Sequence, residues 1–104
     1  KDKYDFISMG EVLEHVDNPR ALLQRLGKLL SQDGILWITT PTNAPAIDHI
    51  YLFRNEDEIV NLIEDSGFKV DASASFYSEE GDRKHLEMNN VTLLYGAFLK
   101  LKTQ

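Results

Sequence analysis

The sequence predicts an α/β fold, a partial three-layer sandwich with a mostly parallel sheet and an antiparallel last strand. Three observations indicate this class. Strand-like apolar runs alternate with segments that carry leucine and isoleucine at helical spacing. The last two strand-like runs alternate apolar and polar residues, as half-buried strands do. The segment between those two runs is too short for a helical crossover, so the final strand should return antiparallel to its neighbour.

The first strand and the first helix are predicted from residues 4 to 34. Tyr4–Met9 is a mostly apolar, strand-prone run that ends at Gly10. Asn18 offers a side-chain cap, and Pro19 stands at the first helical position. Asp33-Gly34 is expected to stop the helix. The apolar stripe between cap and stop comprises Leu22, Leu23, Leu26, Leu29 and Leu30.

The second strand is the continuous β-branched and aromatic run Ile35–Thr40, which Pro41 cuts off. Such a run is typical of a strand buried on both faces of a parallel sheet. We therefore expect Trp37, at its centre, to belong to the core. The unit from Tyr4 to Thr40 becomes a βαβ crossover, which is right-handed in nearly all proteins.

The second half of the chain adds one helix and two strands. Asn55 and Glu58 form a predicted capping box ahead of an apolar stripe, and Ser66-Gly67 is the expected stop. The strand 68–77 should bury one face and expose the other, and the strand 91–101 should return antiparallel to it. The buried faces are predicted as Phe68, Val70, Ala72, Ala74 and Phe76, and as Val91, Leu93, Tyr95, Ala97, Leu99 and Leu101.

Composition excludes several classes of protein. The 104 residues contain no cysteine, so disulfides, thiolate metal sites and cysteine nucleophiles are excluded, in keeping with a cytoplasmic location. No apolar run is long enough to span a bilayer. The formal charge of −6, with scattered lysines and arginines, makes nucleic acid a poor candidate partner. A solvated acidic surface is the simplest interpretation.

The words at the strand and helix junctions resemble those of class I S-adenosylmethionine-dependent methyltransferases. The branch that they most resemble comprises the ubiquinone-biosynthesis O-methyltransferases and their relatives. The quoted words are Tyr4-Asp5-Phe6-Ile7-Ser8-Met9-Gly10-Glu11-Val12-Leu13-Glu14-His15-Val16-Asp17-Asn18-Pro19, Leu30-Ser31-Gln32-Asp33-Gly34-Ile35-Leu36, Thr40-Pro41, His49-Ile50-Tyr51-Leu52-Phe53 and Gly67-Phe68. The resemblance extends over residues 4–70, and beyond them it is only topological. It implies a Rossmann-like sandwich in which strands four, five, seven and six of the family's sheet are present.

The same resemblance implies that residues 1–104 are the C-terminal half of a methyltransferase domain. The family's glycine-rich loop after strand one, and the acidic residue after strand two that holds the ribose, would precede Lys1. None of the six glycines of this chain occurs as Gly-x-Gly, so no local loop replaces that cradle. We therefore expect the N-terminal, cofactor-binding half of the domain to be absent.

Ligands of open α/β sheets sit beyond the carboxyl ends of the strands, which directs attention to the loops at residues 9–11 and 40–43. By resemblance, Met9, Gly10 and Glu11 would contact the methionine end of S-adenosylmethionine, and Gly10 would admit a close approach. A simple strand-ending turn at Gly10 is the alternative. The predicted substrate-binding residues are Pro41, Thr42, Asn43 and His49.

Acidic and histidine residues gather after the first strand. If this stretch is helical, Glu14 and His15 lie near the face of Glu11, and His49 could join them from a later loop. The set suits a divalent metal and resembles the metal site of small-RNA 2′-O-methyltransferases. The alternative is a solvated helix start in which His15 alone acts as the base, or is an ordinary capping histidine.

The sequence therefore predicts S-adenosylmethionine-dependent methyl transfer, on an oxygen of a small molecule, by a longer parent protein. The 104-residue chain itself is expected to be inactive. The alternative is a non-catalytic interaction module that retains the scaffold. The absent strands would leave the edge at Tyr4–Met9 bare, which predicts self-association through that edge.

Overall fold

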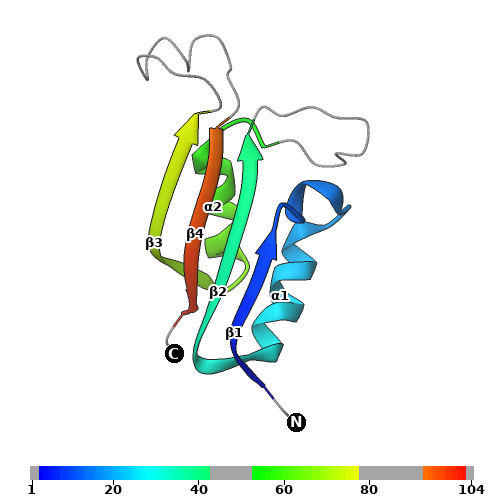
Figure 1. Ribbon diagram of the computed structural model, residues 1–104. Helices are drawn as coiled ribbons and strands as arrows, with labels where there is room; N and C mark the ends of the chain where they lie inside the picture. The colour runs from blue at the N-terminus through cyan, green and yellow to red at the C-terminus, as the bar shows by residue number, and fades with distance from the viewer. Residues whose placement is uncertain (1–2, 43–52, 78–92, 103–104) are drawn as a thin grey trace.

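The computed structural model describes residues 3–42, 53–77 and 93–102 (Figure 1). These residues form a four-stranded sheet with the order β1-β2-β4-β3, and two helices that pack on it. The elements are β1 (Tyr4–Gly10), the 3-10 helix η1 (Leu13–His15), α1 (Pro19–Leu29), β2 (Leu30–Thr42), α2 (Glu56–Asp65), β3 (Phe68–Tyr77) and β4 (Leu93–Leu101). No helix of the described segments is long and apolar enough to cross a membrane.

The topology confirms the predicted fold. β1 and β2 pair in parallel around helix α1, and β4 pairs antiparallel with both β2 and β3. Three of the four strands therefore run in one direction, and β4 runs against them (Figure 1). The strand order is the one expected from the family's strands four, five, seven and six.

The two helices cover the same face of the sheet, which we call the covered face. Leu23 of α1 and Ile59 and Ile63 of α2 are fully buried there. They pack with side chains of the two central strands and of η1, and burial of this apolar surface is the main stabilising term of the fold. The sheet and η1 contribute Met9, Leu13, Leu30, Leu36, Ile38, Tyr95, Ala97 and Leu99 to this core.

Helix α1 begins where the sequence predicts and ends earlier. The Asn18 side chain accepts a hydrogen bond from the Ala21 amide at 3.1 Å, and Pro19 is the first helical residue. The predicted stop at Asp33-Gly34 is wrong, because the helix ends at Leu29 and the chain enters β2 at Leu30. Leu30 is fully buried and pairs with Tyr4, so packing against the sheet ends the helix before the glycine.

Helix α2 has the predicted cap, with one change of partner. The Asn55 side chain accepts a hydrogen bond from the Glu58 amide at 3.0 Å. The Glu58 carboxylate accepts from the amide of Arg54, one residue before the position that a capping box would use. The helix ends at Asp65, directly before the predicted stop Ser66-Gly67, with Ser66 as the C-cap and Gly67 at φ +96°.

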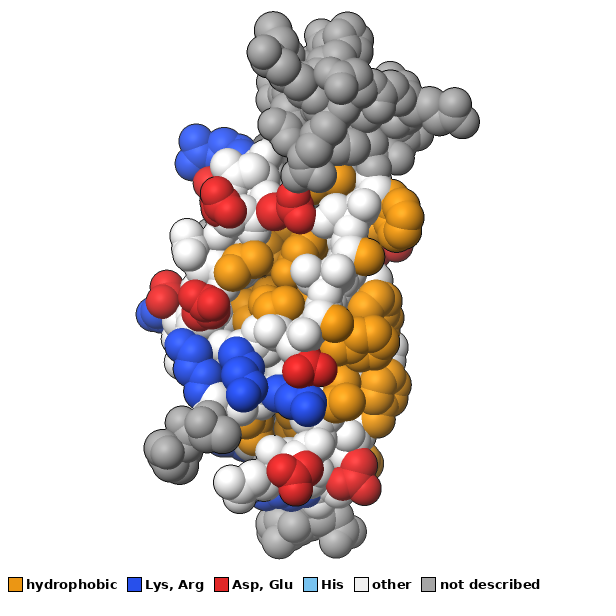
Figure 2. Space-filling view, turned by 90° about the vertical axis from the view of Figure 1, so that its left-hand side faces the viewer, with side chains coloured by type: hydrophobic (Ala, Val, Ile, Leu, Met, Phe, Trp, Pro, Cys, Tyr) orange, Lys and Arg blue, Asp and Glu red, His pale blue; other side chains and the backbone are white. Residues whose placement is uncertain are grey.

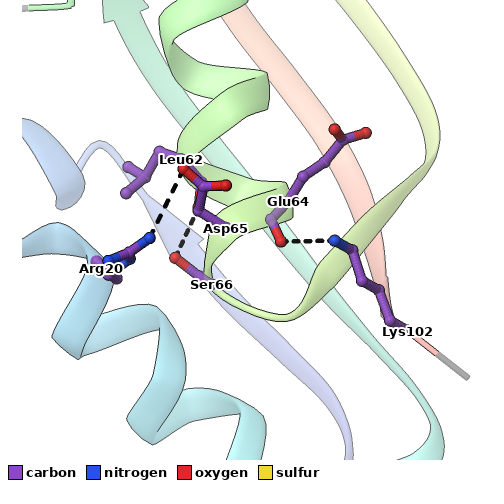
Figure 3. Close-up of polar contacts among 6 residues, drawn as sticks. All are labelled: Arg20, Leu62, Glu64, Asp65, Ser66 and Lys102. Carbon is purple, nitrogen blue, oxygen red and sulfur yellow. Dashed lines mark hydrogen bonds and ion pairs between the residues drawn. The ribbon is translucent and has the colours of Figure 1, made fainter. Parts of the chain in front are cut away.

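Polar contacts close the end of α2 and join it to α1 and to the residue after β4 (Figure 3). The Ser66 hydroxyl donates to the Leu62 carbonyl at 2.6 Å, and the Lys102 ammonium donates to the Glu64 carbonyl at 2.7 Å. A cation at this position also interacts favourably with the helix dipole. Arg20 of α1 lies 3.6 Å from the Asp65 carboxylate, which links the two helices at an exposed site.

The predicted buried face of β3 is wrong beyond Val70. The pairing of β3 with β4 shifts between Val70 and Ala72, so Asp71 is an extra residue in the strand. A one-residue shift reverses the direction of every later side chain. Phe68 is buried on the covered face, whereas Ala72, Ala74 and Phe76 point to the opposite side, where Phe76 is 69% exposed.

That opposite side, which we call the open face, carries apolar side chains without any covering element among the described residues. In Figure 2 the apolar side chains of this face gather along the right-hand side, the side that faces the viewer in Figure 1. Trp37 lies here, half-buried, with its ring 4.7 Å from that of Phe98. The expectation that β2 is buried on both faces is therefore wrong within the described residues.

Candidate functional site

The carboxyl ends of β1 and β2 lie side by side, as the functional interpretation requires. Met9 pairs with Ile38 and Gly10 pairs with Thr39 in a parallel register. β1 is an edge strand, so one flank of this junction is open. Ligand sites of α/β sheets form at such strand ends.

The backbone directly after β1 is strained. Glu11 has φ +54°, in the left-handed region that residues other than glycine rarely adopt, at a typical cost of about 1–2 kcal/mol. Its amide donates a 2.8 Å hydrogen bond to the Thr39 carbonyl, which holds the turn against the end of β2. Gly10 and Glu11 are both exposed. Strained residues of this kind concentrate at functional sites.

The other predicted contact residues that the structure describes are buried. The Met9 side chain is buried in the core, so only its backbone faces the junction. Pro41 and Thr42 are buried as the last residues of β2 and pair with Leu94 and Leu93 of β4. The remaining predicted substrate-binding residues, at positions 43 and 49, lie outside the described residues.

The short helix η1 carries a buried carboxylate to the end of β2. Glu14 is only 2% exposed, and its Oε1 accepts a 2.9 Å hydrogen bond from the Thr40 hydroxyl. Its Oε2 has no hydrogen-bond partner within the described part of the chain and lies 3.7 Å from His15 Nε2. The His15 side chain is 35% exposed. The arrangement therefore places an imidazole between a buried carboxylate and solvent.

A second cluster of polar side chains, between α2 and the sheet, was not predicted from the sequence. The Ser75 hydroxyl donates a 2.6 Å hydrogen bond to the Glu56 carboxylate. Tyr95 lies between Thr40 and Ser75 in the sheet register and is buried. Burial raises the pKa of the Tyr95 phenol, the charge of Glu56 raises it further, and a side-chain hydrogen bond with Ser73 opposes the rise. Polar residues thus continue across the covered face from Glu14 to Glu56.

Thr40 and Tyr95 were missed as polar contacts because the apolar pattern assigns their positions to the core. Ser73 and Ser75 were missed because the predicted alternation placed them on the exposed face of their strand, and only the shift at Asp71 turns them toward Tyr95. Thr40 closes a β-branched run, and its hydroxyl is informative only when paired with Glu14, 26 residues earlier. Neither residue alone indicates the contact. The available signal was a hydroxyl residue at a predicted core position, because a buried hydroxyl needs a polar partner elsewhere in the chain.

Comparison with known proteins identifies the family of this chain. The profile of the family described as "Methyltransferase domain" matches residues 1–73, well over half of the chain. The chain belongs to this family of methyltransferase domains. The resemblance inferred from the junction words is thereby confirmed.

A curated relative supports the same branch of the methyltransferases. The ubiquinone biosynthesis O-methyltransferase of Glaesserella parasuis serovar 5 (strain SH0165) is 49% identical over 39 residues. The match covers 38% of this chain and 16% of the relative. This methyltransferase chain therefore spans only a small part of the length of that relative.

Solved structures share the fold at low sequence identity. The O-methyltransferase from a trans-AT PKS multienzyme of Brevibacillus brevis, solved with S-adenosyl-L-homocysteine, superposes with a TM-score of 0.72 at 14% identity, over 97% of this chain and 45% of its own. The [4+2]-cyclase SpnF gives 0.74 at 10% identity, over 99% and 52%. The mitomycin 7-O-methyltransferase MmcR gives 0.66 at 18%, over 97% and 30%. At these identities the likeness establishes the fold alone.

The residues of this methyltransferase domain fit part of a nucleotide-cofactor site. Among the described residues, a side chain added at Gly10 would meet only the Thr39 hydroxyl, at 3.6 Å, so these residues leave the Gly10 backbone accessible to a ligand. The metal prediction gains no support. No group of three or more metal-binding side chains gathers within residues 3–42, 53–77 and 93–102, and His49 lies outside them.

Proposed function

We propose that this chain is part of an S-adenosylmethionine-dependent methyltransferase that methylates an oxygen atom of a small molecule. The carrying observation is the junction of β1 and β2. There an exposed glycine, a strained Glu11 and a half-buried His15 surround the end of two parallel strands. The oxygen acceptor is supported by the name of the curated relative, a ubiquinone biosynthesis O-methyltransferase.

The residues of the junction have separate roles in this proposal. S-adenosylmethionine, when bound, supplies an electrophilic methyl group. Gly10 allows its methionine end to approach the backbone, and Glu11 contributes a carboxylate beside it. His15, in its neutral form, accepts the proton that an acceptor hydroxyl loses. Glu14 orients the imidazole, because its carboxylate lies 3.7 Å from His15 Nε2 and is itself fixed by Thr40.

The isolated chain is proposed to bind the cofactor weakly and to be inactive. None of its glycines forms a Gly-x-Gly cradle, and the described residues supply only one wall of a pocket at the strand ends. Calorimetric titration of the 104-residue chain should give no saturable signal at micromolar S-adenosylmethionine. Micromolar affinity would refute this part of the proposal.

The activity is tested on the parent protein that contains these residues. Transfer of a labelled methyl group from S-adenosylmethionine to a phenolic acceptor of the ubiquinone-precursor type is the measurement. His15→Gln should lower kcat by about 10²- to 10⁴-fold, with little change in cofactor affinity. Asp17→Asn, at an exposed neighbouring position, serves as the matched control and should retain activity.

The metal proposed from Glu11, Glu14, His15 and His49 is tested on the same parent protein. The spacing of the four residues supports it, whereas the buried hydrogen bond of Glu14 to Thr40 favours the base-only role of His15. Dialysis against a chelator should abolish transfer if a metal is required. Unchanged transfer after chelation would leave His15 as the base without a metal.

The second candidate is a non-catalytic interaction module that has retained the scaffold. SpnF, a [4+2]-cyclase, shares this fold, so the fold by itself does not determine methyl transfer. The gene discriminates between the two candidates. An in-frame Gly-x-Gly segment upstream of Lys1 supports the enzyme, and a start codon there supports the module.

A further inference from the structure

The buried carboxylate of Glu14 has two oxygens in different surroundings. Oε1 accepts a 2.9 Å hydrogen bond from the Thr40 hydroxyl. Oε2 is also buried, and it has no hydrogen-bond partner in the part of the chain that the structure describes. Buried polar atoms are nearly always hydrogen-bonded, because an unsatisfied one keeps its full desolvation cost. The carboxylate therefore requires a second donor, at Oε2.

The imidazole of His15 is the donor that lies beside this oxygen. His15 Nε2 is 3.7 Å from Glu14 Oε2, about 0.5 Å longer than an ordinary N–H···O hydrogen bond. Hydrogen bonds between catalytic groups are often long in the unliganded protein and shorten in the complex. The His15 side chain is 35% exposed, so the ring can turn by this amount without disturbing the core.

Two adjacent residues of β2 fix the turn that carries these groups. The Glu11 amide donates to the Thr39 carbonyl at 2.8 Å, and the Thr40 hydroxyl donates to Glu14. Because Thr40 takes Oε1, Oε2 is the oxygen that faces the imidazole. The end of β2 thus determines which atom of the carboxylate His15 meets.

We propose that Glu14 is a positioning residue that holds the proton of neutral His15 on Nε2, which makes Nδ1 the nitrogen that accepts the proton of the methyl acceptor. This inference rests on the proposed role of His15 as the base and goes further, because it assigns the reacting atom. A neutral imidazole has one N–H donor and one lone pair, whereas an ionised carboxylate can only accept. A carboxylate beside Nε2 therefore selects the tautomer that carries its proton there.

The proton transfer then has a defined course. The O–H bond of the acceptor breaks, its electron pair stays on the acceptor oxygen, and the proton forms an N–H bond at Nδ1. The imidazole becomes an imidazolium with a proton on each nitrogen. The negative charge of Glu14 stabilises this imidazolium, as the buried carboxylate of a catalytic triad does, and the partly exposed ring later releases the proton to water.

The test reads the tautomer of His15 in the 104-residue chain. Long-range nitrogen–proton NMR correlations of the ¹⁵N-labelled chain distinguish the ring nitrogen that carries the proton from the one with the lone pair. The spectra are recorded with a chelator present, at an alkaline pH where the ring shifts no longer change with pH. The signals that His15→Gln removes are those of His15, since the sequence contains three histidines.

Glu14→Gln is the discriminating variant, because it keeps the shape of the side chain and adds a donor. With the amide oxygen on the Thr40 hydroxyl, the amide nitrogen faces His15 and donates to Nε2, so the proton should move to Nδ1. Glu14→Leu removes the carboxylate and should lower the Nε2–H fraction whichever way the glutamine amide turns. Asp17→Asn makes the same change of carboxylate to amide at an exposed position and is the matched control.

We expect the Nε2–H tautomer in the unmodified chain and in Asp17→Asn, and the Nδ1–H tautomer in Glu14→Gln. In the parent protein Glu14→Gln should lower kcat by about 10²- to 10⁴-fold with little change in KM, because the lone pair is then on the wrong nitrogen. Circular dichroism checks that each variant is folded.

Two results would overturn the proposal. One is an Nδ1–H tautomer in the unmodified chain, and the other is a tautomer that neither Glu14→Gln nor Glu14→Leu changes. Both leave the base role of His15 intact, since loss of transfer in His15→Gln decides that role. A parent protein in which His15→Gln transfers methyl groups at the normal rate refutes the base role itself, whatever the tautomer.

Discussion

The two faces of the sheet carry similarly apolar side chains, but among the described residues only one face is covered by helices. The covered face packs Leu36, Ile38 and Leu99 against both helices, and these side chains are fully buried. The open face carries side chains of similar apolarity, including Phe98 and Phe76, which remain exposed. Stability and the polar contacts of the strand ends belong to the covered face. Apolar content alone therefore does not identify the structural core of this chain.

The largest expected difference is between two phenylalanines of β3. Phe68 is fully buried, and Phe76 is 69% exposed, although simple alternation places both on one face. Phe68→Ala should lower the free energy of unfolding by about 3–5 kcal/mol, since it opens a cavity in the core. Phe76→Ala should change it by no more than about 0.5 kcal/mol under monomeric conditions. Denaturant unfolding followed by circular dichroism measures both.

The same pair tests the extra residue at Asp71. If the two alanine variants lost equal stability, the strand would continue in regular alternation and the shift between Val70 and Ala72 would be absent. Deletion of Asp71 provides the complementary variant. The deletion should reverse the direction of every side chain in residues 72–76. It should destabilise the sheet, because Ser73 and Ser75 would turn away from Tyr95 and Glu56.

A smaller difference is expected between adjacent threonines of β2. Thr40 points to the covered face and donates to the buried Glu14, whereas Thr39 points to the open face. Thr40→Val should cost about 1–3 kcal/mol, because it leaves the buried carboxylate without its hydrogen-bond donor. Thr39→Val makes the same replacement of a hydroxyl by a methyl group, and it should change the free energy of unfolding by no more than about 0.5 kcal/mol. Chemical denaturation of both variants makes the comparison.

A double-mutant cycle makes the cause of the Thr40 effect specific. In a Glu14→Leu background, Thr40→Val should become nearly neutral, since no carboxylate remains to be satisfied. An undiminished loss in that background would assign the effect of Thr40 to packing. The role of Glu14 in orienting His15 would then lose its structural support.

Most of the fold could be predicted because its signals are local. Asn18 with Pro19, and Asn55 with Glu58, define helix starts through contacts within a few residues. The two failures depend on contacts between distant residues. The end of α1 is decided by the pairing of Leu30 with Tyr4, and the faces of β3 are decided by an extra residue that only the pairing with β4 reveals.

The candidate site was predictable in location and only partly in geometry. Strand ends and junction words point to residues 9–15, and the parallel pairing of Gly10 with Thr39 places them together. The left-handed backbone of Glu11 has no sequence signal, because glutamate is disfavoured there. The contact of Glu14 with Thr40 joins residues 26 positions apart, so its detection required the register of β1 against β2.

The buried phenol of Tyr95 should make the covered face sensitive to alkaline pH. In the unfolded chain this phenol titrates at its ordinary pKa of 10.0, and in the folded chain burial raises its pKa. Above pH 10 the unfolded chain has therefore released a proton that the folded chain retains, and the stability falls as pH rises. Tyr95→Phe should lose about 1 kcal/mol at neutral pH and show a shallower alkaline decline. A decline as steep as that of the unmodified chain would place the responsible group elsewhere.

The smallest expected effect concerns the centre of the open face. An added side chain at Gly96 would lie 2.8 Å from the far end of the Trp37 ring, so Gly96→Ala must displace that ring. On an open face the ring can move outward, and at monomeric concentration the change should cost less than about 0.5 kcal/mol. The Trp37 emission should shift to the red as the ring enters water. A cost of several kcal/mol would show instead that the ring is held by a covering layer even in the monomer, and the distinction between the two faces would fail.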